Sequence, residues 1–272
     1  METMRSYPDP VEGLNVSRDG AVLRLEIDRP ARRNALTDDI VLAMIDWVEV
    51  AGSDETVRVI HLCASGDHFC SGFDLGLRQG KAADPRAGAI QRRMRWHASR
   101  VIPAILETQT PVVASVQGMT SGLGFTMALA SDFVIAADDT QFWAPYTGGG
   151  FTPDGGLAWM LPRLVGVAHT KDILMLGRKV TGPEAEAWGM IYRCVPRAEM
   201  SRAVDELLAR VGSAATIALG LTKFLVHRGL GMSLDQHMAD EGFAMELAAR
   251  SNDFKEAGRA LRDKRKPDFQ GL

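Results

Sequence analysis

The sequence has few cysteines, few tyrosines and little net charge. Its 272 residues include 3 cysteines and 3 tyrosines, and 31 lysines and arginines nearly balance 34 acidic residues, for a net charge of −3. An odd number of irregularly spaced cysteines is typical of a reducing compartment, not of a disulfide-stabilised secreted domain. A chain this close to neutrality lacks the basic footprint of nucleic-acid binding. We therefore expect a cytoplasmic protein with no nucleic-acid partner.

Long hydrophobic runs are also missing. The most apolar helix-like stretches, such as IALGLTKFLV (217–226), are short and interrupted by Lys223, so they do not match a membrane span. The first residues, METMRSYPDPVEGLN, are polar and broken by prolines, unlike a signal peptide. We expect no membrane partner.

Several common motifs of enzyme sites are absent. There is no GxSxG nucleophile elbow, and Gly118, Gly122 and Gly124 do not form a dinucleotide-binding GxGxxG. His61, Cys63, His68 and Cys70 lie close together in the sequence, but without the paired CxxC spacing of a zinc site. The sequence therefore predicts no bound metal and no nucleotide cofactor.

Hydrophobic patterning predicts alternating strands and helices over the first part of the chain. Residues 14–28 alternate apolar and polar on both sides of Asp19-Gly20, which predicts a β-hairpin. Thr37 precedes a helix with acidic residues in its first turn and Gly52 near its end. Further strands are predicted at residues 57–64, 111–117, 133–137 and 140–145, and helices at about 86–108 and 122–130. This alternation indicates an α/β core with crossover connections.

Strands become rare after about residue 156, and the chain is helix-like beyond about residue 200. We expect the last helix to run from Ser233 to about Lys264. The apolar faces of these helices must pack on the core or on another subunit.

Two turns rich in glycine and serine each join a predicted strand to a predicted helix: SGDHFCSGF (65–73) and VQGMTSGLG (116–124). Small residues at a helix start let a ligand approach the backbone, and the free N–H groups there favour negative charge. Two such turns side by side could direct two N–H groups at one oxygen, which is an oxyanion hole. For either turn alone, a plain tight connection is the simpler interpretation.

Six segments in this order resemble the enoyl-CoA hydratase/isomerase (crotonase) family. They are IDRPARRNALT (27–37), HFCSGFDL (68–75), PVVASVQGMTSGLGFTMALASDF (111–133), FTPDGGLAWMLPRLVG (151–166), TGPEAEAWGM (181–190) and RALRDKRKPDF (259–269). The resemblance implies an α/β fold of repeated ββα units whose strands form two roughly perpendicular sheets, with a C-terminal helical region. It also implies a core at 1–200 that carries the CoA and oxyanion site, and an oligomerisation and CoA-covering region at 201–272.

The resemblance further implies an acyl-CoA substrate, a homotrimer or dimer of trimers, and no cofactor beyond the substrate's own coenzyme A. By position in the family motifs, the two oxyanion-hole amides are those of Phe73 and Leu123. Leu123 stands where the family usually has a glycine, so its side chain must find room. The expected contacts to CoA come from Ser71, Asp74, Leu75 and Lys266.

The sequence departs from the family pattern at two positions. Hydratases of the family use two glutamates, which correspond here to Thr126 and Tyr146. Adding water to a double bond needs one group to deprotonate the water and an acid to protonate carbon, and unperturbed hydroxyls serve poorly in both roles. The standard hydratase mechanism is therefore doubtful for this chain.

Asp154, within GGGFTPDGGL (148–157), is the remaining candidate for proton transfer. It resembles the working aspartate of dienoyl-CoA isomerases and related family members, and a single buried carboxylate can move a double bond by carrying one proton between two carbons. Alternatively, Asp154 caps the helix that starts near Gly155. Three functions follow: a double-bond isomerase, which we favour, a hydratase with a degenerate site, or an acyl-CoA-binding pseudoenzyme.

Overall fold

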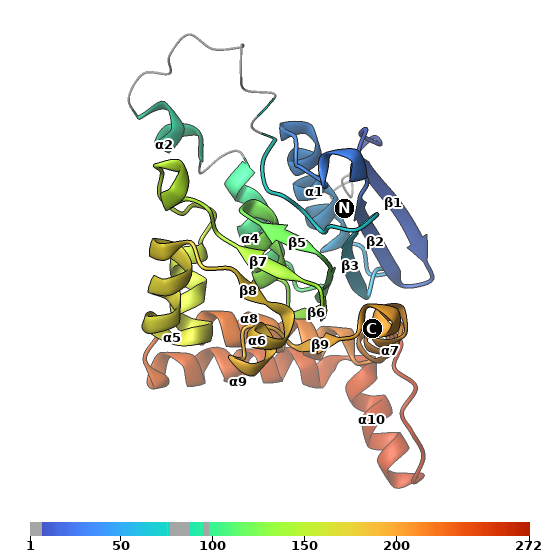
Figure 1. Ribbon diagram of the computed structural model, residues 1–272. Coiled ribbons are helices and arrows are strands. Elements are labelled where there is room, and N and C mark those ends of the chain that lie inside the picture. The colour runs from blue at the N-terminus through green and yellow to red at the C-terminus, as the bar shows by residue number, and fades with distance from the viewer. Residues whose placement is uncertain (1–6, 75, 77–87, 95–97) are drawn as a thin grey trace.

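A six-stranded sheet forms the centre of the structure (Figure 1). The structure is a computed structural model that describes residues 7–74, 76, 88–94 and 98–272. The strand order is β1 (Leu14–Asp19), β2 (Val22–Ile27), β3 (Val59–Ala64), β4 (Val112–Val116), β6 (Phe133–Ala137) and β9 (Arg193–Val195). β1 and β2 form the predicted antiparallel hairpin, and every later pairing in this sheet is parallel. The parallel pairings confirm the predicted α/β core.

A second, three-stranded sheet lies beside the first and consists of β5 (Met119–Ser121), β7 (Gln141–Trp143) and β8 (Val180–Thr181). The strand pair β4–β5 leads into α4 (Leu123–Ala130), and the pair β6–β7 leads towards α5 (Leu157–Leu176), which repeats a ββα unit. This arrangement agrees with the predicted fold class. The sequence pattern did not reveal β5, because three residues are too few to show alternation.

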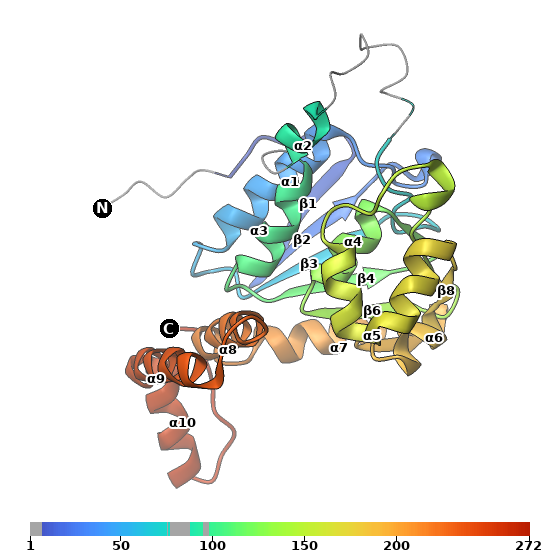
Figure 2. The ribbon, with the colours of Figure 1, turned by 90° about the vertical axis from the view of Figure 1, so that its left-hand side faces the viewer.

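Side chains alternate across the main sheet and form two hydrophobic clusters. On one face, Ile60 and Leu62 of β3 pack with α1 (Asp38–Ala51), α3 (Val101–Glu107) and α4. On the other face, Val59 packs with α7 (Met200–Gly212). Figure 2 shows the sheet between these helices. A sheet covered on both faces explains why the residues of β3 are buried on both sides and mostly apolar.

Local signals set several helix ends where the sequence predicted them. The Thr37 hydroxyl accepts a hydrogen bond of 3.2 Å from the Ile40 N–H, which caps α1. In α6 (Gly182–Ala187), Thr181 and Glu184 form a reciprocal capping box. α5 changes direction at Gly166, whose φ of 75° is not helical.

Two predicted helices are wrong in extent. The described parts of 86–108 form α2 (Ala89–Met94), a 3₁₀ turn (Ala98–Arg100) and α3, not one helix. Pro103 fits near the start of α3, where its missing N–H has no intrahelical role. The last helix is two helices, α9 (Leu234–Arg250) and α10 (Asn252–Arg262), because Ser251 has extended backbone and caps α10.

A buried ion pair attaches the C-terminal helices to the sheet. Lys223 of α8 (Thr216–Gly229) donates to the Asp132 carboxylate at 2.8 Å and to the Ile105 carbonyl at 2.7 Å. The same carboxylate accepts a hydrogen bond of 2.7 Å from the Val112 N–H at the start of β4. α7 packs directly on the main sheet, whereas α10 projects away from it (Figures 1 and 2). The division of the chain near residue 200 stays a prediction.

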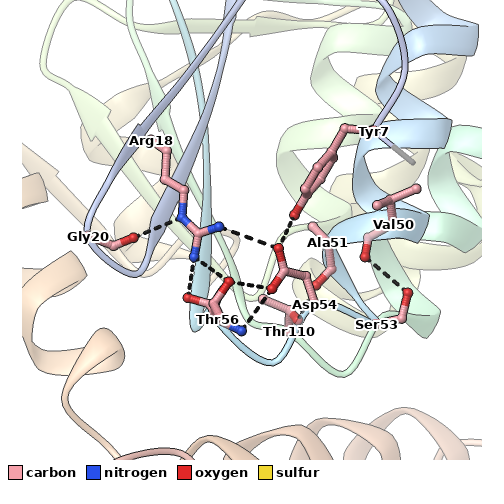
Figure 3. Close-up of polar contacts among 9 residues, drawn as sticks. All are labelled: Tyr7, Arg18, Gly20, Val50, Ala51, Ser53, Asp54, Thr56 and Thr110. Atoms are coloured by element: carbon pink, nitrogen blue, oxygen red, sulfur yellow. Dashed lines mark hydrogen bonds and ion pairs between the residues drawn. The ribbon is translucent and has the colours of Figure 1, made fainter. Parts of the chain in front are cut away.

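A smaller polar cluster anchors the hairpin to the end of α1 (Figure 3). The Arg18 guanidinium contacts the Asp54 carboxylate at 3.4 Å and donates to the Thr56 carbonyl. Tyr7 donates to the same carboxylate at 2.6 Å. Burial opposes ionisation of Asp54, but hydrogen bonds from Thr56 and then Tyr7, with the charge of Arg18, lower its pKa to about 2. The cluster stabilises one edge of the sheet.

Within the described ranges, no single helix is both long and apolar enough to cross a membrane. One bent pair, Arg197–Gly212 with Thr216–Gly229, meets the criteria of length and composition only.

His61 of β3 is a buried imidazole on the α7 side of the sheet. Its Nε2 lies 2.8 Å from the Ser115 Oγ, and its Nδ1 has no hydrogen-bond partner among the residues that the structure describes. Burial lowers the pKa of His61 to about 3, and the nearby charge of Arg24 adds to the effect. The folded protein therefore holds His61 neutral.

This neutral histidine predicts a pH dependence of stability. Between the unfolded pKa of about 6.5 and the folded pKa, the unfolded chain binds the extra proton, so the free energy of unfolding falls as the pH falls. The slope from His61 alone approaches about 1.4 kcal/mol per pH unit. We expect His61→Gln to lose this slope between about pH 6 and about pH 4.5 in urea unfolding. Parallel curves for the two proteins would contradict the assignment.

Candidate active site

The two glycine-rich turns lie against each other at the ends of their strands. A Cβ atom added at Gly72 would lie 3.4 Å from the Ser121 carbonyl oxygen and 3.7 Å from the Gly122 Cα. Both glycines have positive φ, 95° and 54°. Glycine is needed at both positions for this backbone conformation, since residues with a side chain rarely adopt positive φ.

Hydrogen bonds through Cys70 fix the spacing of the two turns. Its N–H donates to the Met119 carbonyl at 3.0 Å, and its carbonyl accepts from the Ser121 N–H at 2.8 Å. The sulfur accepts a hydrogen bond of 3.3 Å from the Gly72 N–H, and a Cβ atom at Gly124 would lie only 2.7 Å from it. Burial raises the pKa of this thiol to about 12. Cys70 is therefore an inert, tightly packed thiol between the turns.

The amides of Phe73 and Leu123 directly follow the two contacting glycines. On either side of Phe73, the Gly72 carbonyl and the Asp74 N–H pair with Leu36 across an isolated parallel bridge. In extended backbone, the N–H of Phe73 then points away from Leu36. Leu123 is the first residue of α4, where N–H groups lack intrahelical partners and favour negative charge. The turns thus bring together the two positions predicted as oxyanion donors.

The turn that carries Asp154 packs on the start of α4. Gly155 and Gly156 have φ values of 63° and 97°, which bend the chain sharply after the acid. A Cβ atom at Gly155 would lie 3.3 Å from the Thr126 Cγ2 and 3.6 Å from the Leu123 Cδ1. The Leu123 side chain therefore finds its room against the Asp154 turn.

Asp154 does not cap α5. The helix begins at Leu157, its N-cap is Gly156, and no side chain in the described part of the chain makes a capping hydrogen bond to it. The alternative structural role considered for Asp154 is therefore wrong. The half-buried carboxylate is held instead beside Thr126 and Tyr146.

Tyr146 and Thr126 place two hydroxyls beside Asp154. Thr126 is fully buried, and its hydroxyl donates to the Gly122 carbonyl at 3.1 Å. Tyr146 is 4% exposed, and burial raises the pKa of its phenol, with the negative charge of Asp154 raising it further. No hydrogen bond of ordinary length and angle joins this phenol to a described residue, although Asp154 and Thr126 are near enough to affect its ionisation. The phenol therefore stays protonated at neutral pH.

The residues predicted to contact CoA are only partly gathered here. The Ser71 N–H donates to the Arg33 carbonyl at 3.0 Å, and the Asp74 carboxylate pairs with Arg29 at 3.1 Å. Leu75 lies outside the described residues. Lys266 is exposed beyond the end of α10, on the part of the chain that projects away from these turns (Figure 1). Contacts from these residues to CoA stay predictions.

The four residues considered for zinc are separately engaged. His61 pairs with Ser115, and the Cys63 sulfur accepts a hydrogen bond of 4.0 Å from the Arg24 guanidinium. The Nδ1 of His68 accepts a hydrogen bond of 3.1 Å from the Met119 N–H, and Cys70 packs between the turns. Among the described residues, no group of three or more histidine, cysteine or acidic side chains has the arrangement of a metal site.

The two glycine-rich turns therefore meet beside the turn that carries Asp154. The family model for enoyl-CoA hydratase/isomerase matches residues 17–271. The chain belongs to the enoyl-CoA hydratase/isomerase family. The resemblance seen in the sequence is thereby confirmed.

Family members of both reaction types are similar to this chain. It is 30% identical over 250 residues to the 1,2-epoxyphenylacetyl-CoA isomerase of Escherichia coli K12, covering 92% of this chain and 95% of the relative. It is 31% identical over 259 residues to the crotonyl-CoA hydratase of Syntrophomonas wolfei, covering 95% and 98%.

Solved structures of the family have the same fold. An enoyl-CoA hydratase from Bacillus anthracis superimposes with a TM-score of 0.88 at 25% identity, covering 96% of this chain and all of the other. One from Polaromonas sp. JS666 gives a TM-score of 0.87 at 26% identity, covering 94% and 99%.

The sequence did not indicate the packing roles of Cys70 and Gly155. The sequence suggested only metal binding as a role for Cys70, because the residues around a cysteine do not indicate which backbone groups it will contact. The signal for Gly155 was present, because two consecutive glycines after an acid indicate a turn with positive φ.

Gly124→Ala tests whether the spacing of the turns matters. The new methyl group would lie 2.4 Å from the Cys70 Cβ, so the start of α4 must shift and carry the Leu123 amide with it. We expect kcat on an acyl-CoA substrate to fall by about 10²–10³-fold, as when one oxyanion donor is lost. Stability should fall by about 1–3 kcal/mol from overpacking.

Gly212→Ala is the matched control, because its methyl group would meet only the Val59 Cγ1, at 3.7 Å. This control should keep full activity. A Gly124→Ala protein with unchanged kcat would show that the turns tolerate displacement.

Proposed function

We propose that the protein is a double-bond isomerase of acyl-CoA thioesters that acts through an enolate. In this proposal the amides of Phe73 and Leu123 donate to the thioester oxygen, and Asp154 transfers the proton. The observation that supports it is the packing of Gly155, directly after Asp154, against Leu123 and Thr126 in α4, whose first N–H is one of the two proposed donors.

The proposed reaction moves one proton from one carbon of the substrate to another, so the net charge of the substrate does not change. Asp154 takes a proton from a carbon conjugated to the thioester, and the electron pair moves through the carbon chain to the thioester oxygen. Donors at that oxygen stabilise the charge by roughly 2.7–4 kcal/mol each. Protonated Asp154 then returns the proton to a different carbon, which shifts the double bond. No electrons are exchanged with another molecule, so we propose no cofactor beyond the CoA of the substrate.

The side chains at the two glutamate positions favour isomerisation over hydration. Thr126 already donates its hydroxyl proton to Gly122, and the pKa of Tyr146 is raised above its ordinary value, so neither is suited to remove a proton from water. The names of the relatives do not distinguish an isomerase from a hydratase. They include the isomerase and the hydratase named above and, at 26% identity, the trans-2-decenoyl-[acyl-carrier-protein] isomerase of Streptococcus mutans.

Asp154→Asn tests this function directly. Asn keeps the shape of the side chain and removes its ability to exchange a proton, so we expect isomerisation to fall by about 10²–10⁴-fold. The assay is a panel of enoyl-, dienoyl- and aryl-CoA thioesters, with hydration of crotonyl-CoA measured beside it. Thioester binding should persist, because the two amides are unchanged.

Stability separates the catalytic role from a structural one. Since Asp154 does not cap α5, both Asp154→Asn and Asp154→Ala should melt close to the unmodified protein. Full isomerase activity in the Asn variant would refute the assignment of Asp154. Crotonyl-CoA hydration faster than any isomerisation would favour the hydratase instead.

We also propose a homotrimer or a dimer of trimers. Support comes from large apolar side chains exposed on α8 and α9, which are Phe224, Val226, Leu234, Met238 and Phe243. Apolar surface gathered on two neighbouring helices is typical of an interface. All three cysteines are free thiols, which fits the cytoplasmic location we propose.

The assembly should be visible in light scattering as a particle of three or six chains. Because Lys266 projects away from the turns of its own chain, we propose that it reaches the CoA of a neighbouring subunit. Binding of CoA should then weaken with added salt, and Lys266→Ala should reduce this salt dependence. A monomeric particle would exclude both the assembly and the contact.

A further inference from the structure

Asn34 is a fully buried polar residue in the loop that follows β2. It is 0% exposed and has a φ of 55°, a left-handed conformation that asparagine tolerates better than most residues. Its Oδ1 accepts a hydrogen bond of 2.7 Å from the Arg29 N–H. Its Nδ2 donates to the Ser65 carbonyl at 2.8 Å and to the His68 carbonyl at 2.6 Å. One side chain thus ties the loop at 29–34 to the segment that follows β3.

The backbone next to Asn34 runs beside the first oxyanion turn. The Arg33 carbonyl accepts from the Ser71 N–H at 3.0 Å, and the Leu36 N–H donates to the Gly72 carbonyl at 2.9 Å. The Leu36 carbonyl in turn accepts from the Asp74 N–H at 2.8 Å. The peptide groups on both sides of Phe73 are therefore oriented by Leu36, two residues from Asn34.

Arg29 supports the same segment from its other side. Its guanidinium donates to the Ala35 carbonyl and pairs with the Asp74 carboxylate at 3.1 Å. Both partners belong to the short ladder between residues 33–36 and 71–74. Asn34 and Arg29 therefore hold the ladder at each end.

We propose that Asn34 is a positioning residue that sets the direction of the Phe73 amide. This inference rests on the proposed function, in which that amide donates to the thioester oxygen. Donors in an oxyanion hole work because they are already oriented when charge develops. A displacement of about 1 Å, even from a change remote from the reacting atoms, costs about 10²-fold in rate. Releasing the three hydrogen bonds of Asn34 frees the segment that orients Phe73.

Asn34→Gly is the sharpest test, because glycine keeps the left-handed backbone without strain while all three side-chain bonds are lost. We expect kcat on the best thioester of the panel to fall by about 10- to 100-fold. KM should change by less than about 3-fold, since the bulk of the thioester contacts are untouched. Asn15→Ala, which removes an exposed asparagine bonded to Asp28, is the control and should keep full activity.

An infrared readout separates positioning from general destabilisation. A dienoyl-CoA labelled with a heavy isotope at the thioester carbonyl should show a lowered carbonyl stretch when bound to the unmodified protein. In Asn34→Gly this band should move back towards its value in solution. An unchanged band with unchanged kcat would overturn the role of Asn34, and so would a loss expressed only in KM.

The outcomes also distinguish this inference from the proposed function. Absence of any carbonyl shift in the unmodified protein would overturn the oxyanion assignment itself. If Asn34→Gly does not fold, Asn34→Asp carries the test, because it keeps the acceptor for the Arg29 N–H and removes the donor to the Ser65 and His68 carbonyls. In that variant the carbonyl stretch should also move part of the way back towards its frequency in solution. A stretch that stays as low as in the unmodified protein would overturn the proposal.

Discussion

The contact between the backbones at Gly72 and Gly122 is the constraint on which the site depends. It brings together the ends of two segments, one following β3 and one following β4, through glycines whose positive φ a residue with a side chain rarely adopts. Everything around it maintains this contact. Cys70 bonds across the gap through its N–H and its carbonyl, while its sulfur accepts from Gly72 in its own turn. The parallel pairing of β3 with β4 fixes the register of the two segments. The proposed donors, the N–H groups of Phe73 and Leu123, belong to the backbone that follows these glycines, so they do not depend on the identity of the surrounding side chains.

Those surrounding side chains decide which reaction the donors serve. Leu123 combines both aspects, because its amide belongs to the donor pair while its side chain packs against the turn after Asp154. A leucine at this position therefore couples the placement of the carboxylate to the placement of the amide. Thr126 and Tyr146 lie beside Asp154 as neutral groups. The Thr126 hydroxyl donates to the Gly122 carbonyl, and burial keeps the Tyr146 phenol protonated. In the function that we propose, Asp154 is therefore the one acid of the site.

The sequence predicted best those elements whose signals are local. The hairpin at Asp19-Gly20 and the cap of α1 by Thr37 are where the sequence put them, because turn chemistry and capping depend on a few adjacent residues. The sequence prediction failed where the hydrophobic pattern does not mark the end of a helix or the presence of a short strand. Ser251 stops α9 and starts α10 within a stretch of unbroken helical periodicity, and the three residues of β5 are ordered by pairing with β7. It also offered capping as a role for Asp154, which the actual start of α5 at Leu157 removes.

The family, the α/β class and the identity of the candidate residues were determined by the sequence alone, because six motifs in order and alternating strands and helices are properties of the linear chain. Which of those residues meet was decided only by tertiary structure. Asn34 reads as an ordinary loop asparagine, and its link to Ser65, His68 and the Phe73 segment exists only once three separate loops are brought together. Lys266 is the opposite case, since it belongs to a basic segment but follows α10, a helix that projects away from the sheet (Figure 2). The reason is the same for both: hydrogen bonds and charge pairs act over a few ångströms, and distances of that size between remote residues are set by the packing of the sheet and its helices.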